Sequence, residues 1–261
     1  MSRIKAIFKR EFFAYFRSPI GYVVFAIFMA VSGLYFASGI MSSYIDIVSE
    51  LNFVQSFLFI IIPLMTMRSF SEDRRNGTEV LLFTSPANTL EIVLGKYLAA
   101  LALFVVMTAG TFTHLIIASL YGGLLDISVL GAYIGFIFLG VAYVSIGCFA
   151  SALTENQIIA AVISFVIMLV LMLLDFVSSM LGSVTATLLD KINFVGLSDL
   201  QIDAAGTAVT DALKWLNPMT RLNNYVNGIF EIAPILFFIS MAAAFIYLTN
   251  RILEKRRWSQ R

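Results

Sequence analysis

Long apolar segments alternate with short charged segments along the chain, and this pattern predicts helices that cross a membrane. A hydrocarbon core about 30 Å thick takes roughly 20 apolar residues in a helix. Six segments meet or approach this length, so we expect six transmembrane helices. They cover about 20–41, 51–70, 92–120, 129–152, 158–181 and 233–250. The predicted fold class is an all-α membrane protein that forms a single transmembrane domain over 1–261.

The composition strengthens this interpretation. Of the 261 residues, 60% are hydrophobic and only 13% are charged, and the mean hydropathy is +0.92. An ordinary soluble domain has about 25% charged residues, so the chain is not a soluble enzyme domain, a disordered tail or a disulfide scaffold. The net charge of +1 does not favour nucleic acid as a partner. One cysteine, Cys148, and one histidine, His114, make a thiolate or histidine metal centre improbable in one chain, and we expect no metal.

The lysines and arginines predict the orientation. If the N-terminus is inside, fourteen of the 17 basic residues fall in inner segments and three, Lys191, Lys214 and Arg221, fall in outer ones. Because short cytoplasmic segments carry the excess of basic residues, both termini are expected in the cytoplasm.

Residues 2–18 precede the first span and predict an amphipathic helix in the inner interface. One side carries apolar residues and the other carries Arg3, Arg10 and Arg17 at intervals of seven. One alternative is a basic N-terminal segment that is exposed to solvent. The more specific hypothesis is an interfacial helix in which Glu11 pairs with a cytoplasmic arginine. The dipeptide Ser18-Pro19 should end this helix.

The inner loop over 68–96 predicts a short cytoplasmic helix over 78–84. Asn76-Gly77 is a turn signal, Thr78 is a candidate cap and Glu79 suits the helix N-terminus. The members of this helix are Thr78, Glu79, Val80, Leu81, Leu82, Phe83 and Thr84. Exposure of four adjacent apolar residues to the cytoplasm is unfavourable unless another protein surface buries them. Either they pack back on the membrane domain, or, as we favour, they dock a cytoplasmic partner. Thr89 is a candidate cap for the helix that follows.

The outer segment over 182–232 predicts short re-entrant or interfacial helices before the last span. Asn217-Pro218 marks a break in an apolar stretch that is too short to cross the membrane. In the spans, Gly131 and Gly135 permit a close helix approach, expected within the bundle rather than at a dimer seam. Pro63 should bend the second span.

The chain carries no motif for catalysis. The only Gly-Lys pair, Gly95-Lys96, lacks the remainder of a phosphate-binding loop, so ATP hydrolysis by that route is excluded and no catalytic residue is assigned. We expect His114 to be a buried histidine bonded to a neighbouring hydroxyl or carbonyl, with a proton relay or substrate contact as the alternative. Asp175 is placed at the outer interface, and no other ionisable group is expected in the membrane core.

Three motifs occur in an order that resembles ABC-2 type transporter permeases. EDRRNGTEVLLFTSPANTLEIVLGK resembles the coupling segment of that family, and FKREFFAYFRSPIGYVVFAIF resembles its interfacial helix entering the first span. LNPMTRLNNYVNGIFEI, followed by a last span and LEKRRW, resembles its C-terminal third. The closest subgroup is the gliding-motility and copper-processing type. Arg221 departs from the pattern, because many relatives have a histidine or an aromatic residue there.

The resemblance implies a half-transporter of the type V exporter fold in the bacterial inner membrane. Two copies, as a homodimer, would form the pore. Each copy would bind one cytoplasmic ATPase subunit, which holds the ATP and Mg, through the coupling helix over 78–84, and the chain itself would hold no cofactor. A charged belt would transmit the motion through Glu11, Glu72, Asp73, Arg74 and Arg75. The outer helix motif would comprise Asn217, Pro218, Arg221 and Gly228.

Two other functions stay open. The chain could be a non-pumping membrane scaffold that recruits a cytoplasmic ATPase to an envelope assembly, with an accessory envelope protein as a further partner. A secondary carrier is disfavoured, because the expected spans lack charges and corresponding breaks. Short outer loops weakly favour a lipid-like, amphipathic or peptide cargo, and the lack of an external capture domain favours export.

Overall fold

A computed structural model describes residues 2–42, 44–121, 126–191 and 198–259. Of the described residues, 85% are helical and none is in a strand. The elements, in chain order, are α1 Ser2–Arg17, α2 Pro19–Met41, α3 Ile47–Gln55, α4 Leu58–Thr66, α5 Ser71–Arg75, α6 Glu79–Thr84, α7 Thr89–Gly110, α8 Phe112–Leu120, α9 Ile127–Leu153, α10 Gln157–Met172, α11 Leu174–Lys191, α12 Asp199–Lys214, η1 Thr220–Leu222, α13 Asn223–Val226 and α14 Ile232–Ser259. The all-helical fold class is confirmed.

Helices α7 and α9 form the centre of the bundle. In their most apolar windows 61% of residues are buried, against 22% in α2 and α14. Both kinds of helix are apolar on every side, because α9 is surrounded by other helices and the less buried α2 and α14 would face lipid. The described part of the chain has four helices long and apolar enough to cross a membrane, or six if each of two bent helix pairs is one span.

The first bent pair falls in the predicted span 51–70. Helix α3 and the segment 58–75 meet at 59°. The break lies at Ser56-Phe57, whereas Pro63 lies inside α4. The prediction that Pro63 bends this span is therefore wrong about the place of the sharp bend. The predicted span 92–120 is present as one helical segment, Thr89–Leu120, with a single turn residue at Thr111 between α7 and α8.

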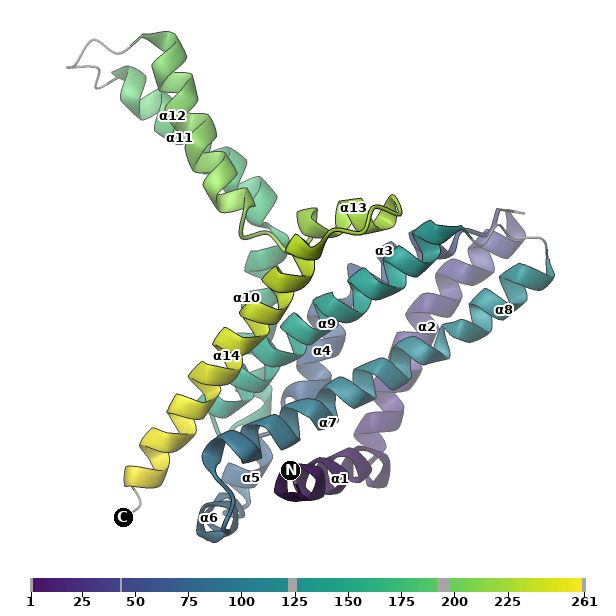
Figure 1. The fold of residues 1–261 in the computed structure, drawn as a ribbon, viewed down its shortest axis with the longest axis vertical. Coiled ribbons are helices and arrows are strands. Elements are labelled where there is room, and N and C mark those ends of the chain that lie inside the picture. Colours follow the sequence, from purple (N-terminus) through teal and green to yellow (C-terminus); the bar gives the residue numbers. More distant parts are fainter. Residues whose placement is uncertain (1, 43, 122–125, 192–197, 260–261) are drawn as a thin grey trace.

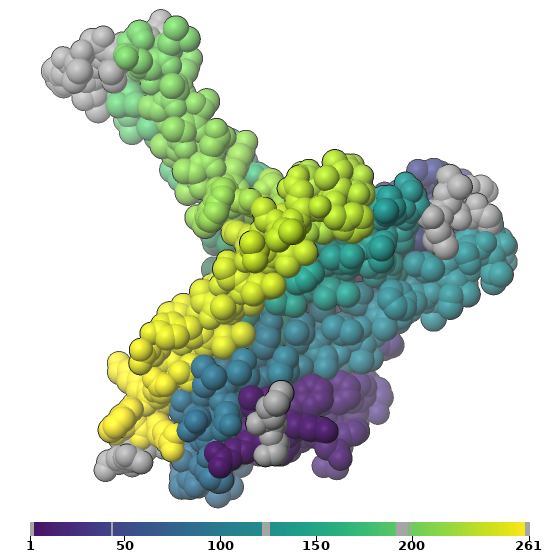
Figure 2. Space-filling view, in the orientation of Figure 1, coloured from purple at the N-terminus to yellow at the C-terminus, as the bar shows by residue number. Residues whose placement is uncertain are grey.

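The second bent pair leads out of the bundle. Helices α10 and α11 meet at 58°, and α11 then pairs with α12 in a hairpin that projects away from the other helices (Figures 1 and 2). Gly182 of α11 faces Gly206 and Thr210 of α12, which lets the two backbones lie close together. The first part of the predicted outer segment differs from short helices, because α11 and α12 are long and bury their small residues against each other, whereas the stretch after α12 does contain short helices, η1 and α13.

The two ends of the bundle differ in what they carry. Helices α1, α5 and α6 lie at the same end as the N-terminus and the C-terminal end of α14 (Figure 1). Helix α13 and the α11–α12 hairpin lie at the opposite end. Pro19 at the start of α2 ends α1 after Arg17 and turns the chain, since Ser18 adopts an extended conformation that precedes proline well.

Candidate functional site

The predicted coupling helix is present as α6, a short helix at the end of the molecule that carries both termini. It follows α5 after a turn at Asn76-Gly77. Gly77 has φ of +71°, which a residue without a side chain adopts at little cost. Glu79 lies in the first turn of α6, where the helix dipole favours a negative charge.

The apolar side chains of α6 divide between two sides. Val80 and Leu81 are exposed, and Leu81 keeps 71% of its surface. Leu82 and Phe83 are buried, with 8% and 9% exposed, and belong to the hydrophobic core. Successive residues of a helix point in different directions, so a run of four apolar residues cannot all face outward. The predicted uncovered apolar surface is thus correct for Val80 and Leu81 and wrong for Leu82 and Phe83.

A groove beside Leu81 separates α6 from α1. Its volume is about 330 Å³. The lining residues are Arg3, Ala6, Ile7, Arg10, Leu81, Leu82, Ser85, Pro86 and Ala87. Arg3 Nη1 donates a hydrogen bond of 2.6 Å to the Pro86 carbonyl and thereby joins α1 to the end of the coupling segment. The groove combines apolar walls with arginine side chains.

Two predicted helix caps are replaced by other contacts. The Thr78 hydroxyl does not cap α6 but donates to Asp73 Oδ1 at 2.7 Å. Helix α7 is capped by Asn88 rather than Thr89, and the Glu91 carboxylate accepts from the Asn88 backbone N–H at 2.9 Å. In the first case the Asp73 carboxylate takes the Thr78 hydroxyl as its donor. In the second case Asn88 occupies the capping position that Thr89 was expected to hold.

Lys96 lies at the centre of a buried ionic cluster that the sequence analysis did not predict. Its side chain is 3% exposed, and its ammonium lies 2.6 Å from Asp73 Oδ2 and 3.1 Å from Glu11 Oε1. It also donates to the Ser69 carbonyl at 2.7 Å. The ammonium thus donates one hydrogen bond to a backbone carbonyl and forms ion pairs with two carboxylates. The sequence did contain a signal for this cluster. The predicted third span begins at 92, so Lys96 falls inside it, and a lysine within a packed helix requires carboxylate partners.

The residues of the predicted charged belt do not form one network but make contacts at three separate places. Glu11 and Asp73 meet at Lys96, and Glu11 also accepts from Arg10 at 2.6 Å, so its predicted arginine partner is present. Glu72 pairs instead with Arg68 at 3.4 Å. The remaining two members, Arg74 and Arg75, lie apart from Lys96, with Arg74 3.6 Å from Glu155 and Arg75 exposed. A polar cavity of about 260 Å³ adjoins the Lys96 cluster.

A second contact joins α6 to the last helix. Arg256 Nη1 lies 3.5 Å from Glu79 Oε1, and Nη2 donates to the Ala152 carbonyl at the end of α9. The side chains of Arg256 and Glu79 are largely buried. In the sequence analysis Arg256 counted only as one of the positive charges of the inner segments. Nothing in the spacing of residues 79 and 256 indicates that they are in contact.

The residues of the predicted outer helix motif fold as one local unit. Asn217 is buried, and its Oδ1 accepts from the Met219 N–H at 2.8 Å after Pro218. Arg221 donates to the Trp215 carbonyl at 3.0 Å and lies over the Trp215 ring. Gly228 has φ of +73° and allows the turn into α14.

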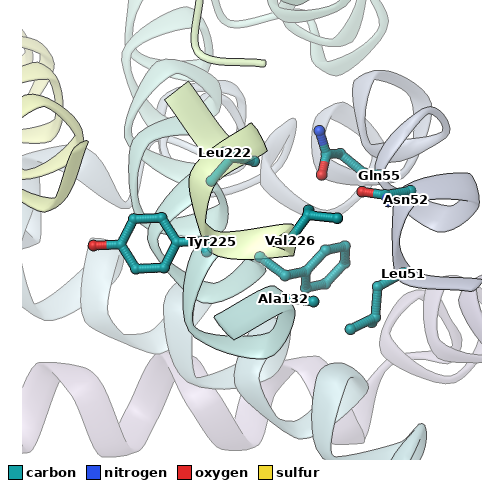
Figure 3. Close-up of a pocket in the computed structure, with 9 residues that line it drawn as sticks. Leu51, Asn52, Gln55, Ala132, Leu222, Tyr225 and Val226 are labelled. Atoms are coloured by element: carbon teal, nitrogen blue, oxygen red, sulfur yellow. The ribbon is translucent and has the colours of Figure 1, made fainter. Parts of the chain in front are cut away.

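This outer unit packs on α9 at the two glycines that the sequence singled out. Leu222 and Tyr225 lie against Gly135 and Gly131, and a Cβ at Gly135 would lie 2.9 Å from Leu222 Cδ2. Figure 3 shows Leu222, Tyr225 and Val226 of this unit beside the α3 residues Leu51, Asn52 and Gln55 and above Ala132 of α9, and these residues line a cavity of only about 10 Å³. The prediction that these glycines serve close packing within the bundle is confirmed.

His114 is buried, as expected, but its main partner is a carboxylate. Nδ1 lies 2.6 Å from Glu50 Oε1 and 3.3 Å from Ser32 Oγ. The expectation that the spans contain no further ionisable group is wrong, because Glu50 of α3 is 1% exposed. The three residues do not form a nucleophilic relay, since serine and carboxylate meet the same imidazole nitrogen. Among the described residues, no group of three histidine, cysteine, aspartate or glutamate side chains is arranged to hold a metal ion.

Long apolar helices, with a charged cluster and an exposed short helix at one end, define an integral membrane protein with a transporter-like architecture. A family model described as "ABC-2 family transporter protein" matches residues 5–258. The chain belongs to this family and is a membrane permease of an ABC transporter. The family implies a partner subunit that binds ATP. A search of curated proteins found no significant match.

Proposed function

We propose that this permease is half of an exporter and that it docks one separate cytoplasmic ATPase subunit through α6. The observation that carries the proposal is the exposed Leu81 on a helix held at both of its ends. An exposed leucine on a rigid support suits a docking contact, because little conformational entropy is lost on binding. The groove between α1 and α6 gives the partner room beside this leucine.

Two chains of contacts support a transmission role for α6. At its N-terminal end, Thr78 contacts Asp73, and Asp73 contacts Lys96 at the start of α7. From Lys96 the second ion pair reaches Glu11 on α1. Glu79 contacts Arg256 on α14. A displacement of α6 by the ATPase is therefore passed to α1, α7 and α14 through buried or half-buried ionic contacts.

The proposed assembly follows from the same architecture. The proposed arrangement has six spans, with each bent pair counted as one, and both termini on the cytoplasmic side of a bacterial inner membrane, which the distribution of positive residues favours. Two copies with two ATPase subunits form the pump, and ATP with Mg binds in the ATPase. The proposed cargo is lipid-like, amphipathic or peptide, moved outward. The gliding-motility and copper-processing subgroup stays a prediction.

The test is co-purification of the ATPase with permease variants. Leu81→Asp should weaken the complex at least about tenfold, since a charge replaces an apolar docking contact. Leu200→Asp is the matched control, because Leu200 is an exposed leucine at the opposite end of the molecule. Leu82→Asp is unsuitable, since Leu82 is buried. Unchanged co-purification of a folded Leu81→Asp variant would refute docking through α6.

The projecting α11–α12 hairpin favours a second candidate function. Beyond the predicted span 158–181 it exposes apolar side chains, including Val184, Leu188 and Leu200, which suits contact with an accessory envelope protein. Such a protein fits a scaffold that recruits the ATPase without pumping. Cargo-stimulated ATP hydrolysis by the purified complex separates the two functions, because a scaffold predicts no stimulation.

A further inference from the structure

The cations of α1 fall into two groups. They are Arg3, Lys5, Lys9, Arg10 and Arg17. Arg3 lies 3.8 Å from the Glu91 carboxylate on α7, and Arg10 lies 2.6 Å from a carboxylate on its own helix. The other three are exposed, and none of them pairs with a carboxylate in the part of the chain that the structure describes. The charge of these three is therefore available to a partner outside the chain.

These three cations lie on one ridge of α1, which we call the basic ridge. With Phe13 they follow one another at intervals of four, as Lys5, Lys9, Phe13 and Arg17. Residues four apart in a helix form a continuous ridge on its surface. The opposite side of α1 packs on the bundle, where Ile7 lies against Gly95 of α7 and Tyr15 is 4% exposed. The basic ridge thus faces away from the other helices, and its Phe13 is 48% exposed.

An aromatic row runs beside the basic ridge. Phe8, Phe12 and Phe16 also follow one another at intervals of four, and neighbouring ring centroids are 5.7 Å and 5.2 Å apart. The row continues to Tyr22 of α2, whose ring centroid lies 6.0 Å from that of Phe16. Tyr22 is 59% exposed near the start of a helix long and apolar enough to cross a membrane. Aromatic side chains are typical of the boundary between acyl chains and headgroups, so this row places the basic ridge at the level of the headgroups.

We propose that the basic ridge binds the headgroups of anionic phospholipids where the first span enters the membrane. The lysine and arginine side chains attract headgroups of net negative charge, while Phe13 and the aromatic row contact the acyl chains. Helix α1 lies across the end of the bundle, which suits a helix in the plane of the membrane surface (Figure 1).

An acidic protein surface is the other partner that these charges allow. The aromatic row favours lipid, because it joins the basic ridge to the exposed apolar surface of α2. The groove beside α6 is instead lined by Arg3 and Arg10, the two cations that are not part of the basic ridge. Lipid and the ATPase therefore use different sides of α1.

The test measures which lipid lies next to the basic ridge. Phe13→Trp, combined with Trp215→Phe and Trp258→Phe, gives a single fluorophore on the ridge. The full chain is placed in nanodiscs of equal parts phosphatidylglycerol and phosphatidylcholine, with bromine on the acyl chains of one lipid or the other. Bromine quenches tryptophan on contact, so the ratio of the two quenching constants reports the local enrichment of phosphatidylglycerol. Leu120→Trp in the same background is the reference, because Leu120 is exposed at the opposite end of the molecule.

We expect phosphatidylglycerol to be enriched about fivefold at residue 13 and not at residue 120, and a fivefold ratio corresponds to ~1 kcal/mol. Lys5→Gln with Lys9→Gln should reduce the enrichment to about twofold, since one cation of the ridge remains. Lys5→Arg with Lys9→Arg should retain it, because the charge is unchanged. Arg75→Gln with Lys255→Gln is the matched control, which removes the same charge from exposed positions outside α1 and should leave the enrichment as it is.

Salt gives a second measurement, which decides the matter if the double glutamine variant does not fold. Raising the KCl concentration from about 0.05 M to about 0.5 M should reduce the enrichment, because salt screens exposed charges. Equal quenching by the two lipids at residue 13 overturns the proposal and assigns these cations to an acidic protein surface. An enrichment that persists without the two lysines, or at high salt, overturns it as well. No ATPase is present, so neither result bears on docking through α6.

Discussion

The Lys96 ammonium on α7 lies 2.6 Å from the Asp73 carboxylate on α5, and this contact connects the coupling segment to a central helix of the bundle. Glu11 on α1 approaches the same ammonium from another side at 3.1 Å. Three elements distant in sequence are thus fixed at one buried cation. Since Asp73 also accepts from Thr78, the start of α6 is one contact away from Lys96.

Replacing the buried cation should destabilise the permease. Lys96→Met leaves Glu11 and Asp73 without their shared partner, and we expect the free energy of unfolding to fall by about 3 kcal/mol. Thermal denaturation of the detergent-solubilised protein measures the change. Lys255→Met is the control, because Lys255 is exposed and should leave the transition where it is. Equal stability of the two variants would contradict a structural role for Lys96.

The Glu79–Arg256 contact should hold α6 against α14. Glu79→Gln removes one charge of this half-buried pair, and amide hydrogen exchange over 79–84 should accelerate about fivefold, which is ~1 kcal/mol. Glu155→Gln serves for comparison, because its contact with Arg74 is more exposed. Exchange in α6 that is equally slow in both variants would show that the contact contributes nothing.

Close packing at Gly131 should tolerate no side chain. A Cβ there meets the backbone carbonyl of Tyr225, which cannot move as a flexible side chain could. Gly131→Ala should therefore cost about 2 kcal/mol of stability. Gly33→Ala is a glycine control in open space and should be neutral or stabilising by about 0.5–1 kcal/mol. The comparison of their thermal midpoints checks this, and an undiminished midpoint for Gly131→Ala would be the contrary result.

Arg221 should stabilise the outer unit through two aromatic rings. Its guanidinium lies 5.0 Å from the Trp215 ring centroid and 5.2 Å from that of Phe237. Arg221→Ala should weaken the packing of this unit by about 1 kcal/mol and alter the Trp215 fluorescence, whereas Arg221→Lys should retain part of the effect. The second tryptophan, Trp258, is removed by Trp258→Phe for this measurement. An emission spectrum identical to that of the parent would exclude the interaction.

The helices and the exposure of Leu81 could be predicted from the sequence, because both follow from the local pattern of apolar and polar residues. The apolar lengths predicted helical segments, and Asn76-Gly77 predicted the turn before α6. The division of α6 into exposed Leu81 and buried Leu82 required the position of the neighbouring helices. Periodicity over six residues does not give the side on which a partner lies.

The ionic contacts were less predictable, since their partners are distant in sequence. Lys96 reaches back to Glu11 over 85 residues, and Glu50 meets His114 after 64. Glu50 lies just before the predicted span 51–70, whereas the cap at Asp46 begins α3 ahead of that residue. Here the helix signal was present in the sequence, as an aspartate followed by residues that continue the helix.

Protection of residue 81 by the ATPase tests the central claim most directly. Leu81→Cys is labelled by a thiol reagent in the purified permease alone and in the complex, with buried Cys148 as the only other cysteine in the sequence. Docking through α6 predicts that the ATPase slows labelling of residue 81 about tenfold and leaves Leu200→Cys unaffected. Equal labelling of residue 81 with and without the bound ATPase would contradict the account.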